Sequence, residues 1–372
     1  MSLRDMASLR DTASLSAASI LADNQAPGRL AGIEASRGIA ASLVILYHVA
    51  RHLDKTSGAP LLKSLFQFGH AGVDFFFVIS GFIILFVHHG DVGHPDRFTR
   101  YVKRRFTRLA PTYWVALTMT VLLMLAGNHE APSFTDIAWS ASLLPSDRDM
   151  VLGVAWTLRY EVLFYALFCV LILHRTAGLA VMALWFSCTV LAMVFSYETQ
   201  WLPSQFHGAY NLEFFLGMAA AWVLKNFTVP QAKLLAVAGI VAFAAFGVLE
   251  DLLILDGHGG AARLAYGIPS ACIVLGIAAA DQQRPSRVPV LLQQTGAASY
   301  SIYLFQFVFI GMVWKTLLVT RLNETLPVLV QFFLLSAAAI GGGILVSRWV
   351  EHPLMHLIRN WRRPLQARPK MG

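Results

Sequence analysis

This 372-residue sequence contains few charged residues. Charged residues make up 13% of the chain and hydrophobic residues 56%, whereas about a quarter of the residues in an ordinary water-soluble domain are charged. The apolar runs are also too long and too numerous for one soluble core. The composition therefore excludes a soluble domain for most of the chain and indicates that lipid surrounds it.

Two further shortages exclude other classes. All three cysteines fall inside apolar runs without the spacing of metal ligands, so neither a disulfide framework nor a cysteine metal site is expected. The histidines of "HHGDVGH" (88–94) have no acidic or cysteine ligands clustered at fixed spacing, so we predict no metal site there or elsewhere. Residues 1–30 are rich in Ala and Ser but lack a continuous apolar stretch. They are not a signal peptide, and we expect a mobile cytoplasmic tail.

Crossing a bilayer takes about 20 mostly apolar residues, and about ten runs approach that length. With soft boundaries, the runs are 36–53, 69–88, 109–126, 152–174, 178–196, 208–224, 234–249, 264–280, 296–317 and 328–350. Backbone amides in lipid must be satisfied within the protein, and the runs lack the alternation of a barrel strand. We therefore predict an all-α integral membrane protein with about ten transmembrane helices over residues 31–355.

The distribution of Lys and Arg predicts the orientation. If the N-terminus is cytoplasmic, 21 of the 29 Lys and Arg residues fall on the inner side and 8 on the outer side. Because cytoplasmic loops carry the excess of positive charge, we expect both termini in the cytoplasm, a basic tail at 356–372 and a multi-pass protein of the inner (plasma) membrane. The net charge of +8 then faces anionic lipid headgroups, and no nucleic-acid partner is needed to explain it.

The first run, "SRGIAASLVILYHVARHL", carries Arg37 near its start and His48 near its end. A charge at mid-bilayer costs about 2.5–3.5 kcal/mol, so such residues point to function. Eleven residues make close to three helical turns, which places Arg37 and His48 on one face about 16 Å apart. The structural alternatives are a neutral buried histidine and an interfacial arginine anchor.

Two acidic residues are candidate partners of His48. In "WTLRYEVLFY", Glu161 lies about 10 Å below the predicted outer end of its helix, at a depth comparable to His48. A carboxylate that reaches the imidazole would orient it. Asp74, in "FGHAGVDFFFVISGF", is a second possible partner or merely a polar residue at a helix end. The alternative for Glu161 is a structural ion pair with Arg159 or Arg37.

Small and polar residues indicate helix contacts in the second and ninth runs. Gly69, Gly72 and Gly81 suit close approach of another helix. In "SYSIYLFQF", Tyr303 and Gln306 belong to one polar face of an apolar helix. Packing between helices is the favoured interpretation of that face.

The connection "RFTRYVKRRFTRLAPTYW" carries six cations within twelve residues, before Pro111, where we expect the third span to start. In a helix, Arg105 and Arg108 share a face, and so do Arg104 and Arg108. Paired guanidinium groups suit phosphate, which they grip bidentately. The alternative is a topology anchor attracted to lipid headgroups.

These stretches, in this order, resemble the acyltransferase-3 family of bacterial membrane acyltransferases, which includes exopolysaccharide and O-antigen O-acetyltransferases. The resemblance covers roughly residues 31–355. The stretches that carry it are "GIEASRGIAASLVILYH", "GHAGVDFFFVISGF", "RRFTRLAPTYW", "WTLRYEVLFY", "FFLGM", "GAASYSIYLFQ" and "VEHPL".

The resemblance implies roles for several residues. Arg37 and His48 match an arginine and a histidine that are typically required for activity. Arg105 and Arg108 match the element that holds the acyl donor. One departure is Gln306, where relatives often have histidine, so that position either only forms hydrogen bonds or offers no proton transfer.

The aromatic and acidic motif of the fourth helix also matches the family. Its residues here are Trp156, Glu161, Phe164 and Tyr165. Among them, Trp156 and Tyr165 are candidates for contact with substrate.

The expected reaction moves an acyl group, acetyl by default, from acetyl-CoA to a hydroxyl of a polysaccharide or lipid-linked glycan, with no permanently bound cofactor. Arg104, Arg105 and Arg108 would hold the phosphates of the donor. His48 would act as general base, oriented by Glu161 or Asp74, or would carry the acyl group itself. The candidate oxyanion donors are Tyr165, Tyr303 and Gln306.

Two other classes remain open at this point. A multi-span transporter or flippase for a sugar or lipid-linked glycan also uses intramembrane His, Glu and Asp, although no internal repeat relates the two halves of the chain. A structural membrane subunit is the second alternative.

Overall fold

The computed structural model describes residues 30–127, 131–195, 201–284 and 287–360, and this part of the chain is helical without strands. Almost all of the predicted N-terminal tail, 1–30, lies outside the described residues. Of the predicted tail 356–372, residues 356–360 belong to the last helix and the remainder lies outside the described residues.

The long helices are α2 (Ala31–Ser57), α4 (Gly72–His88), α5 (Phe98–Ala126), α7 (Trp156–Leu173), α8 (Arg175–Val194), α9 (Asn211–Asn226), α10 (Ala232–Asp251), α11 (Gly260–Gln283), α13 (Ser299–Val319) and α15 (Val328–Val346). The short α-helices are α3 (Pro60–Leu65), α6 (Phe134–Ser142), α12 (Val290–Ala297), α14 (Leu322–Thr325) and α16 (His352–Asn360). Single turns of 3₁₀ or π helix are η1 (Gln67–Ala71), η2 (His89–Asp91), η3 (Pro95–Arg97), η4 (Gly153–Ala155), η5 (Ser204–Phe206) and η6 (Ser347–Glu351).

Nine helical segments of the described chain are long and apolar enough to cross a membrane. This confirms an all-α protein with many candidate spans. The run predicted at 208–224 forms α9, which has only 16 residues. Such a helix is about 24 Å long, shorter than the roughly 30 Å hydrocarbon core, which explains why the count is nine and not ten.

Pro111 does not begin a helix, because α5 starts at Phe98 and runs through this proline. The helix has 29 residues in all. Proline removes one backbone donor from a helix, and membrane helices tolerate it when neighbouring groups satisfy the freed carbonyl. The cationic segment is therefore the first part of the same helix. Arg105 and Arg108 project from a regular element and not from a loop.

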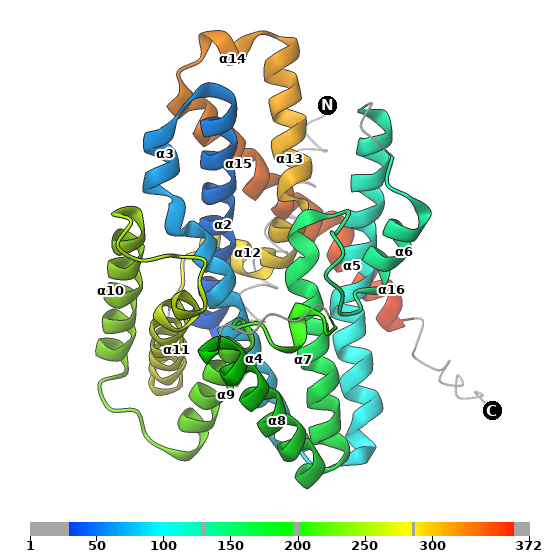
Figure 1. Ribbon diagram of the computed structural model, residues 1–372, viewed down its shortest axis with the longest axis vertical. Helices are drawn as coiled ribbons and strands as arrows, with labels where there is room; N and C mark the ends of the chain where they lie inside the picture. Colours follow the sequence, from blue (N-terminus) through cyan, green and yellow to red (C-terminus); the bar gives the residue numbers. More distant parts are fainter. Residues whose placement is uncertain (1–29, 128–130, 196–200, 285–286, 361–372) are drawn as a thin grey trace, which may run out of the picture.

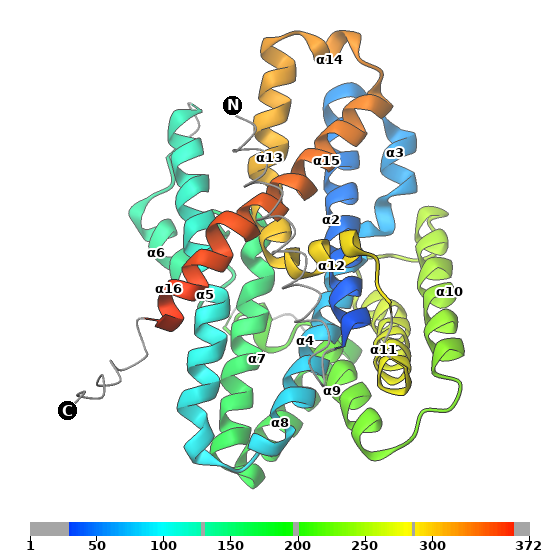
Figure 2. The same ribbon diagram turned by 180° about the vertical axis from the view of Figure 1, so that it is seen from behind.

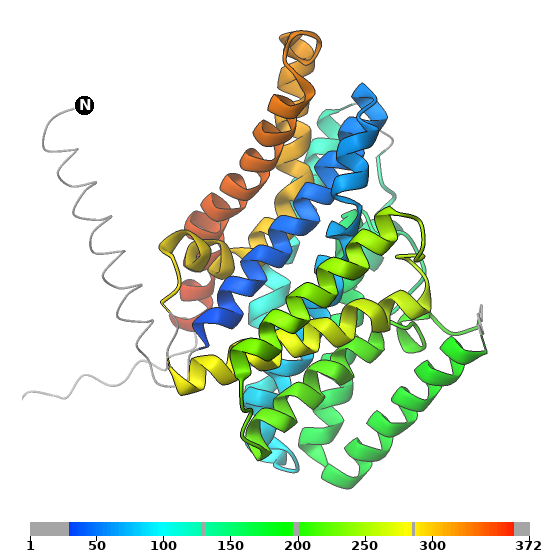
Figure 3. The same ribbon diagram turned by 90° about the vertical axis from the view of Figure 1, so that its left-hand side faces the viewer.

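The helices form one tilted bundle with α4 near its centre (Figures 1 and 3). Helices α9, α10 and α11 lie on one side and α5, α6 and α7 on the other (Figure 1). Helices α13 and α15 pack together and against α2, and α12 lies across the long helices (Figure 2). We call the end at which α2 begins the inner end and the end at which it finishes the outer end, after the topology that the sequence predicts.

Glycines bring α4 and η1 against two neighbouring helices, as the sequence predicts. A Cβ atom on Gly69 or Gly72 would lie 2.6 Å from a backbone carbonyl oxygen of α2. A Cβ atom on Gly81 would overlap the carbonyl of Phe214 in α9. Backbone-to-backbone approach of this kind requires small residues, and it fixes α4 between α2 and α9.

Apolar side chains pack on both sides of α4. Phe77 and Phe164 belong to the cluster between α4 and α7, and Phe82 belongs to the cluster that α4 shares with α10 and α11. Helix α4 is therefore a wall common to both halves of the bundle, and its polar residues face different neighbours on each side.

Adding one methyl group at the α4–α9 crossing is expected to destabilise the bundle. A Cβ atom on Gly217 would overlap the Val78 carbonyl and lie 2.7 Å from the Phe82 nitrogen. Overpacking of this kind costs about 1–3 kcal/mol, so Gly217→Ala should lower the thermal unfolding midpoint of the detergent-purified protein. The control is Gly311→Ala, where no atom lies within 4 Å and alanine favours the helix. Equal midpoints for the two variants would contradict the close crossing.

Candidate active site

A cavity lies among α2, α4, α5, α7 and α13. The polar residues of its lining are Arg37, Ser80, Arg105, Arg108, Thr157, Glu161, Tyr165, Ser299, Tyr300 and Tyr303. Along α4 the lining extends from Val73 to Ile84, which corresponds to about 16 Å of helix. The cavity therefore follows much of the membrane-embedded length of α4, between apolar walls.

The inner part of the cavity carries two of the predicted cations. The Arg105 guanidinium donates to His88 Nε2 at 3.1 Å and lies over the rings of Tyr101 and Tyr165. Arg108 lines the cavity and is exposed on its other side. Arg104 is exposed and lies outside the lining, so the structure places two of the three arginines at the cavity.

His88 is a neighbour of Arg105 that the sequence analysis did not identify. A guanidinium only donates hydrogen bonds, so His88 Nε2 must accept from Arg105. The Nδ1–H of His88 then donates to Asp91 Oδ2 at 2.8 Å. This chain of Asp91, His88 and Arg105 orients the guanidinium. The spacing of His88 and Asp91 in "HHGDVGH" is the available signal in the sequence, and it suits a hydrogen-bonded pair better than a metal site.

Glu161 faces the cavity and not His48. Its Oε1 atom accepts hydrogen bonds from the Tyr165 hydroxyl and from Ser80 Oγ, the latter at 3.4 Å. Arg159, one of its expected structural partners, turns away and donates to the Ser146 carbonyl at 2.6 Å. Arg37 shares the cavity lining with Glu161.

Positive charge exceeds negative charge in this lining. Three guanidinium groups, from Arg37, Arg105 and Arg108, accompany the single carboxylate of Glu161. Charges in apolar surroundings are expensive unless they are paired. The excess of cations therefore suits an anionic ligand that enters from the exposed, cationic end.

His48 lies beyond the outer part of the cavity. Its ring contacts those of Tyr47, at a centroid distance of 5.0 Å, and of Phe307 at 4.8 Å. It has no hydrogen bond to any described residue and is not in the lining. Tyr303, one helical turn before Phe307 on α13, does line the cavity. Phe307, which contacts the imidazole, therefore lies about one turn of α13 beyond Tyr303, which lines the cavity.

Asp74 pairs with Arg263 and not with His48. Its Oδ1 atom accepts from Arg263 Nη1 at 2.6 Å, and the two side chains are 0% and 2% exposed. A buried carboxylate without a cation is strongly unfavourable, which explains why Asp74 binds the buried guanidinium. Among the described residues, neither Asp74 nor Glu161 forms a hydrogen bond or ion pair with His48.

The remaining candidates divide between the cavity and the helix packing. The Tyr303 hydroxyl, in the cavity, donates to the Val154 carbonyl at 2.9 Å. Tyr165 is also in the lining. Gln306 donates to the Tyr303 carbonyl at 2.9 Å and lies outside the lining. Trp156 packs on the Tyr210 ring at 5.1 Å, also outside the lining.

A cationic cavity within a bundle of candidate membrane spans is typical of a membrane protein with a functional site between its helices. The chain belongs to the acyltransferase-3 family, since the family model described as an acyltransferase domain matches residues 30–348. It is 32% identical over 304 residues to the exopolysaccharide production protein ExoZ of Rhizobium meliloti (strain 1021), covering 78% of this chain and 90% of that protein. No solved structure matches the chain.

The family membership bears on the classes that the sequence left open. The chain is a multi-pass membrane protein of an acyltransferase family, which supports an acyltransferase over a transporter or a structural subunit. Its candidate active site is the cavity that carries Arg37, Arg105, Arg108 and Glu161.

The Asp74–Arg263 pair is expected to be structural, with a measurable coupling. Removing one partner of a buried pair costs about 3–5 kcal/mol, because the other charge stays buried and unpaired. Arg263→Met should therefore lower the thermal unfolding midpoint strongly, and Asp74→Asn in the same chain should restore much of it. Thermal unfolding of the single and double variants in detergent measures the coupling. A double variant no more stable than Arg263→Met would contradict the pairing.

Proposed function

We propose that the protein transfers an acyl group, acetyl in the simplest case, from acyl-CoA to a hydroxyl of a surface carbohydrate such as an exopolysaccharide or its lipid-linked precursor. The observation that carries the proposal is the cationic cavity in a chain of the acyltransferase family. The name of the relative ExoZ supports an exopolysaccharide as acceptor. The protein would work in the plasma membrane with both termini in the cytoplasm.

The cationic lining and its length along α4 support acyl-CoA as the donor. The phosphates of coenzyme A would bind Arg105 and Arg108, where the cavity reaches the surface, with exposed Arg104 beside them. Bidentate pairing of guanidinium and phosphate supplies affinity. The pantetheine arm would then extend along α4 past Arg37 and Glu161, over about 16 Å, and place the thioester near Tyr303.

The acceptor would approach from the outer end, where His48 lies. In the transfer step, His48 takes the proton of the acceptor hydroxyl while the hydroxyl oxygen attacks the thioester carbonyl carbon. The carbon–sulfur bond then breaks, and the departing thiolate recovers that proton. The oxyanion formed in between requires a donor. Tyr303 is the candidate, because it lines the cavity one helical turn before Phe307, which contacts His48. Its hydroxyl would exchange the Val154 carbonyl for the oxyanion.

His48 and His52 form a matched pair for testing the base. Both lie on α2 in edge contact with an aromatic ring of α13, His48 with Phe307 and His52 with Trp314. Loss of a general base usually slows a reaction about 10²–10⁴-fold, so His48→Ala should lose acyl transfer while His52→Ala retains it. The measurement is transfer from labelled acetyl-CoA by the protein in detergent or liposomes.

The same assay distinguishes direct transfer from an acyl-histidine. Under single-turnover conditions without acceptor, direct transfer leaves no label on His48. Full activity of His48→Ala would contradict the role of His48 altogether. Labelled His48 would replace general-base catalysis with covalent catalysis.

Removing a cavity guanidinium is expected to weaken donor binding. Arg105→Ala or Arg108→Ala removes one charge-assisted hydrogen-bonding group, worth about 1.5–3 kcal/mol, so the KM for acyl-CoA should rise about ten- to a hundredfold. Lys103→Ala is the control, because Lys103 is an exposed cation of α5 outside the lining. An equal rise in KM for all three variants would indicate general attraction to the basic surface instead of a donor site.

A further inference from the structure

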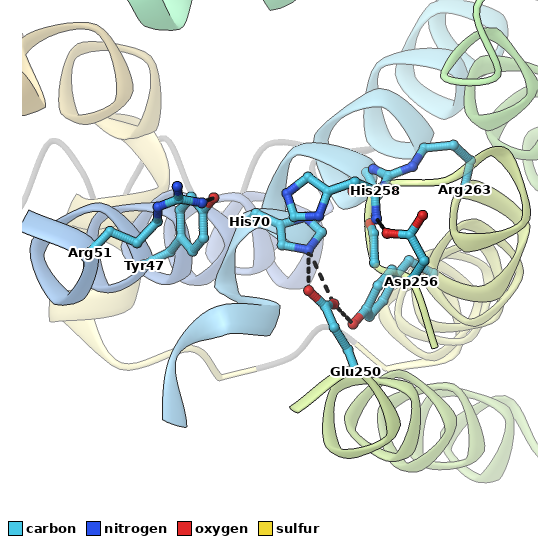
Figure 4. A network of polar contacts seen from close by, with 10 residues as sticks. Tyr47, Arg51, His70, Glu250, Asp256, His258 and Arg263 are labelled. Atoms are coloured by element: carbon cyan, nitrogen blue, oxygen red, sulfur yellow. Dashed lines mark hydrogen bonds and ion pairs between the residues drawn. The ribbon is translucent and has the colours of Figure 1, made fainter. Parts of the chain in front are cut away.

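A second group of polar side chains lies at the outer end of the bundle, outside the cavity. His70 of η1, Glu250 near the end of α10 and His258 of the α10–α11 connection converge there (Figure 4). Each offers one potential ligand atom, and these atoms all lie within 4.8 Å of one another. The fold therefore brings together two imidazoles and a carboxylate from separate segments of the chain.

The contacts within this group are close. His70 Nε2 lies 2.9 Å from Glu250 Oε1 and 3.1 Å from Oε2. The side chains of His70 and Glu250 are 10% and 5% exposed. The His258 ring lies 4.7 Å from the His70 ring, and its residue is exposed. One side of the group is thus held in the protein and the other is open to the surroundings.

Neighbouring residues hold the Glu250 side chain and the backbone at His258 in place. The Tyr266 hydroxyl donates to Glu250 Oε2 at 2.6 Å, which leaves Oε1 toward His70. The His258 backbone N–H donates to Asp256 Oδ1 at 3.0 Å, which fixes the connection. Ligands of metal ions in proteins are characteristically oriented by such surrounding hydrogen bonds.

Although the sequence alone predicts no metal site, we propose that His70, Glu250 and His258 bind a divalent transition-metal ion, with Zn²⁺ as the best fit. Imidazole and carboxylate are ordinary zinc ligands, whereas Ca²⁺ and Mg²⁺ prefer oxygen alone. Ligand bonds of about 2.0–2.2 Å in a tetrahedron place neighbouring ligand atoms about 3.3 Å apart. Small side-chain rotations therefore suffice to bring the three ligand atoms to bonding distance of one ion. A water molecule would complete the coordination on the open side.

The ion would fasten the α10–α11 connection to η1 beside the proposed base. The Tyr47 ring contacts the ring of His70 at 5.6 Å and that of His48 at 5.0 Å. The metal would thereby stabilise the wall next to His48. This consequence rests on the proposed function, whereas metal binding itself does not.

Metal content of the full-length protein tests the proposal directly. The protein, purified in detergent with an affinity tag that lacks histidine, is stripped with chelator, incubated with Zn²⁺ and passed through gel filtration. We expect one Zn²⁺ per chain by elemental analysis, a higher thermal unfolding midpoint with Zn²⁺, and no such shift with Mg²⁺. Failure of the wild-type protein to retain Zn²⁺ would overturn the proposal.

Conservative variants identify the ligands. The readout is Zn²⁺ affinity and not acyl-transfer activity. His258→Gln, in an exposed connection, and Glu250→Gln, which keeps the shape and the Tyr266 contact, should each weaken Zn²⁺ binding at least tenfold. His94→Ala is the control, since this exposed histidine lies outside the group. Monodisperse elution shows that each variant is folded. Unchanged Zn²⁺ affinity in both glutamine variants would assign the ion to another site and contradict the proposal.

Discussion

The structure depends on one constraint, that a charge among membrane-embedded helices needs a partner. Asp74 and Arg263 form an ion pair at 2.6 Å, and both side chains are almost closed to solvent. Glu161 is satisfied by two hydroxyl groups. The cavity departs from this balance, because it holds three guanidinium groups and one carboxylate. An anionic substrate is what would restore the balance, and this links the packing of the bundle to its proposed chemistry.

Helix α4 connects these parts. Its glycines allow close contact with α2 and α9, so its two faces pack against different neighbours. Ser80 faces the cavity and bonds Glu161, whereas Asp74, fewer than two turns earlier, faces Arg263 of α11. Just before α4, His70 reaches Glu250 at the outer end of α10. One short helix thus organises the cavity, the buried ion pair and the histidine group.

The sequence predicts what periodicity and hydropathy determine. It anticipates the helices, the glycine contacts, and the residues Arg37, Arg105, Arg108 and Glu161 that prove to share one cavity. Periodicity specifies the face of a helix but not which helix lies opposite. Arg263, 189 residues from Asp74, was therefore not identified as its partner, and Glu161 was placed toward His48 instead of toward Ser80. The His88–Arg105 contact was missed for the same reason, because it joins the ends of two helices.

The most direct measurement is a structure of the protein in lipid nanodiscs with a non-hydrolysable acyl-CoA analogue, determined by electron cryomicroscopy. We expect phosphate density against Arg105 and Arg108, and the pantetheine arm along α4 past Arg37 with its acyl end near Tyr303. Density for the analogue outside this cavity, with the cavity still closed by side chains, would contradict the proposed donor site.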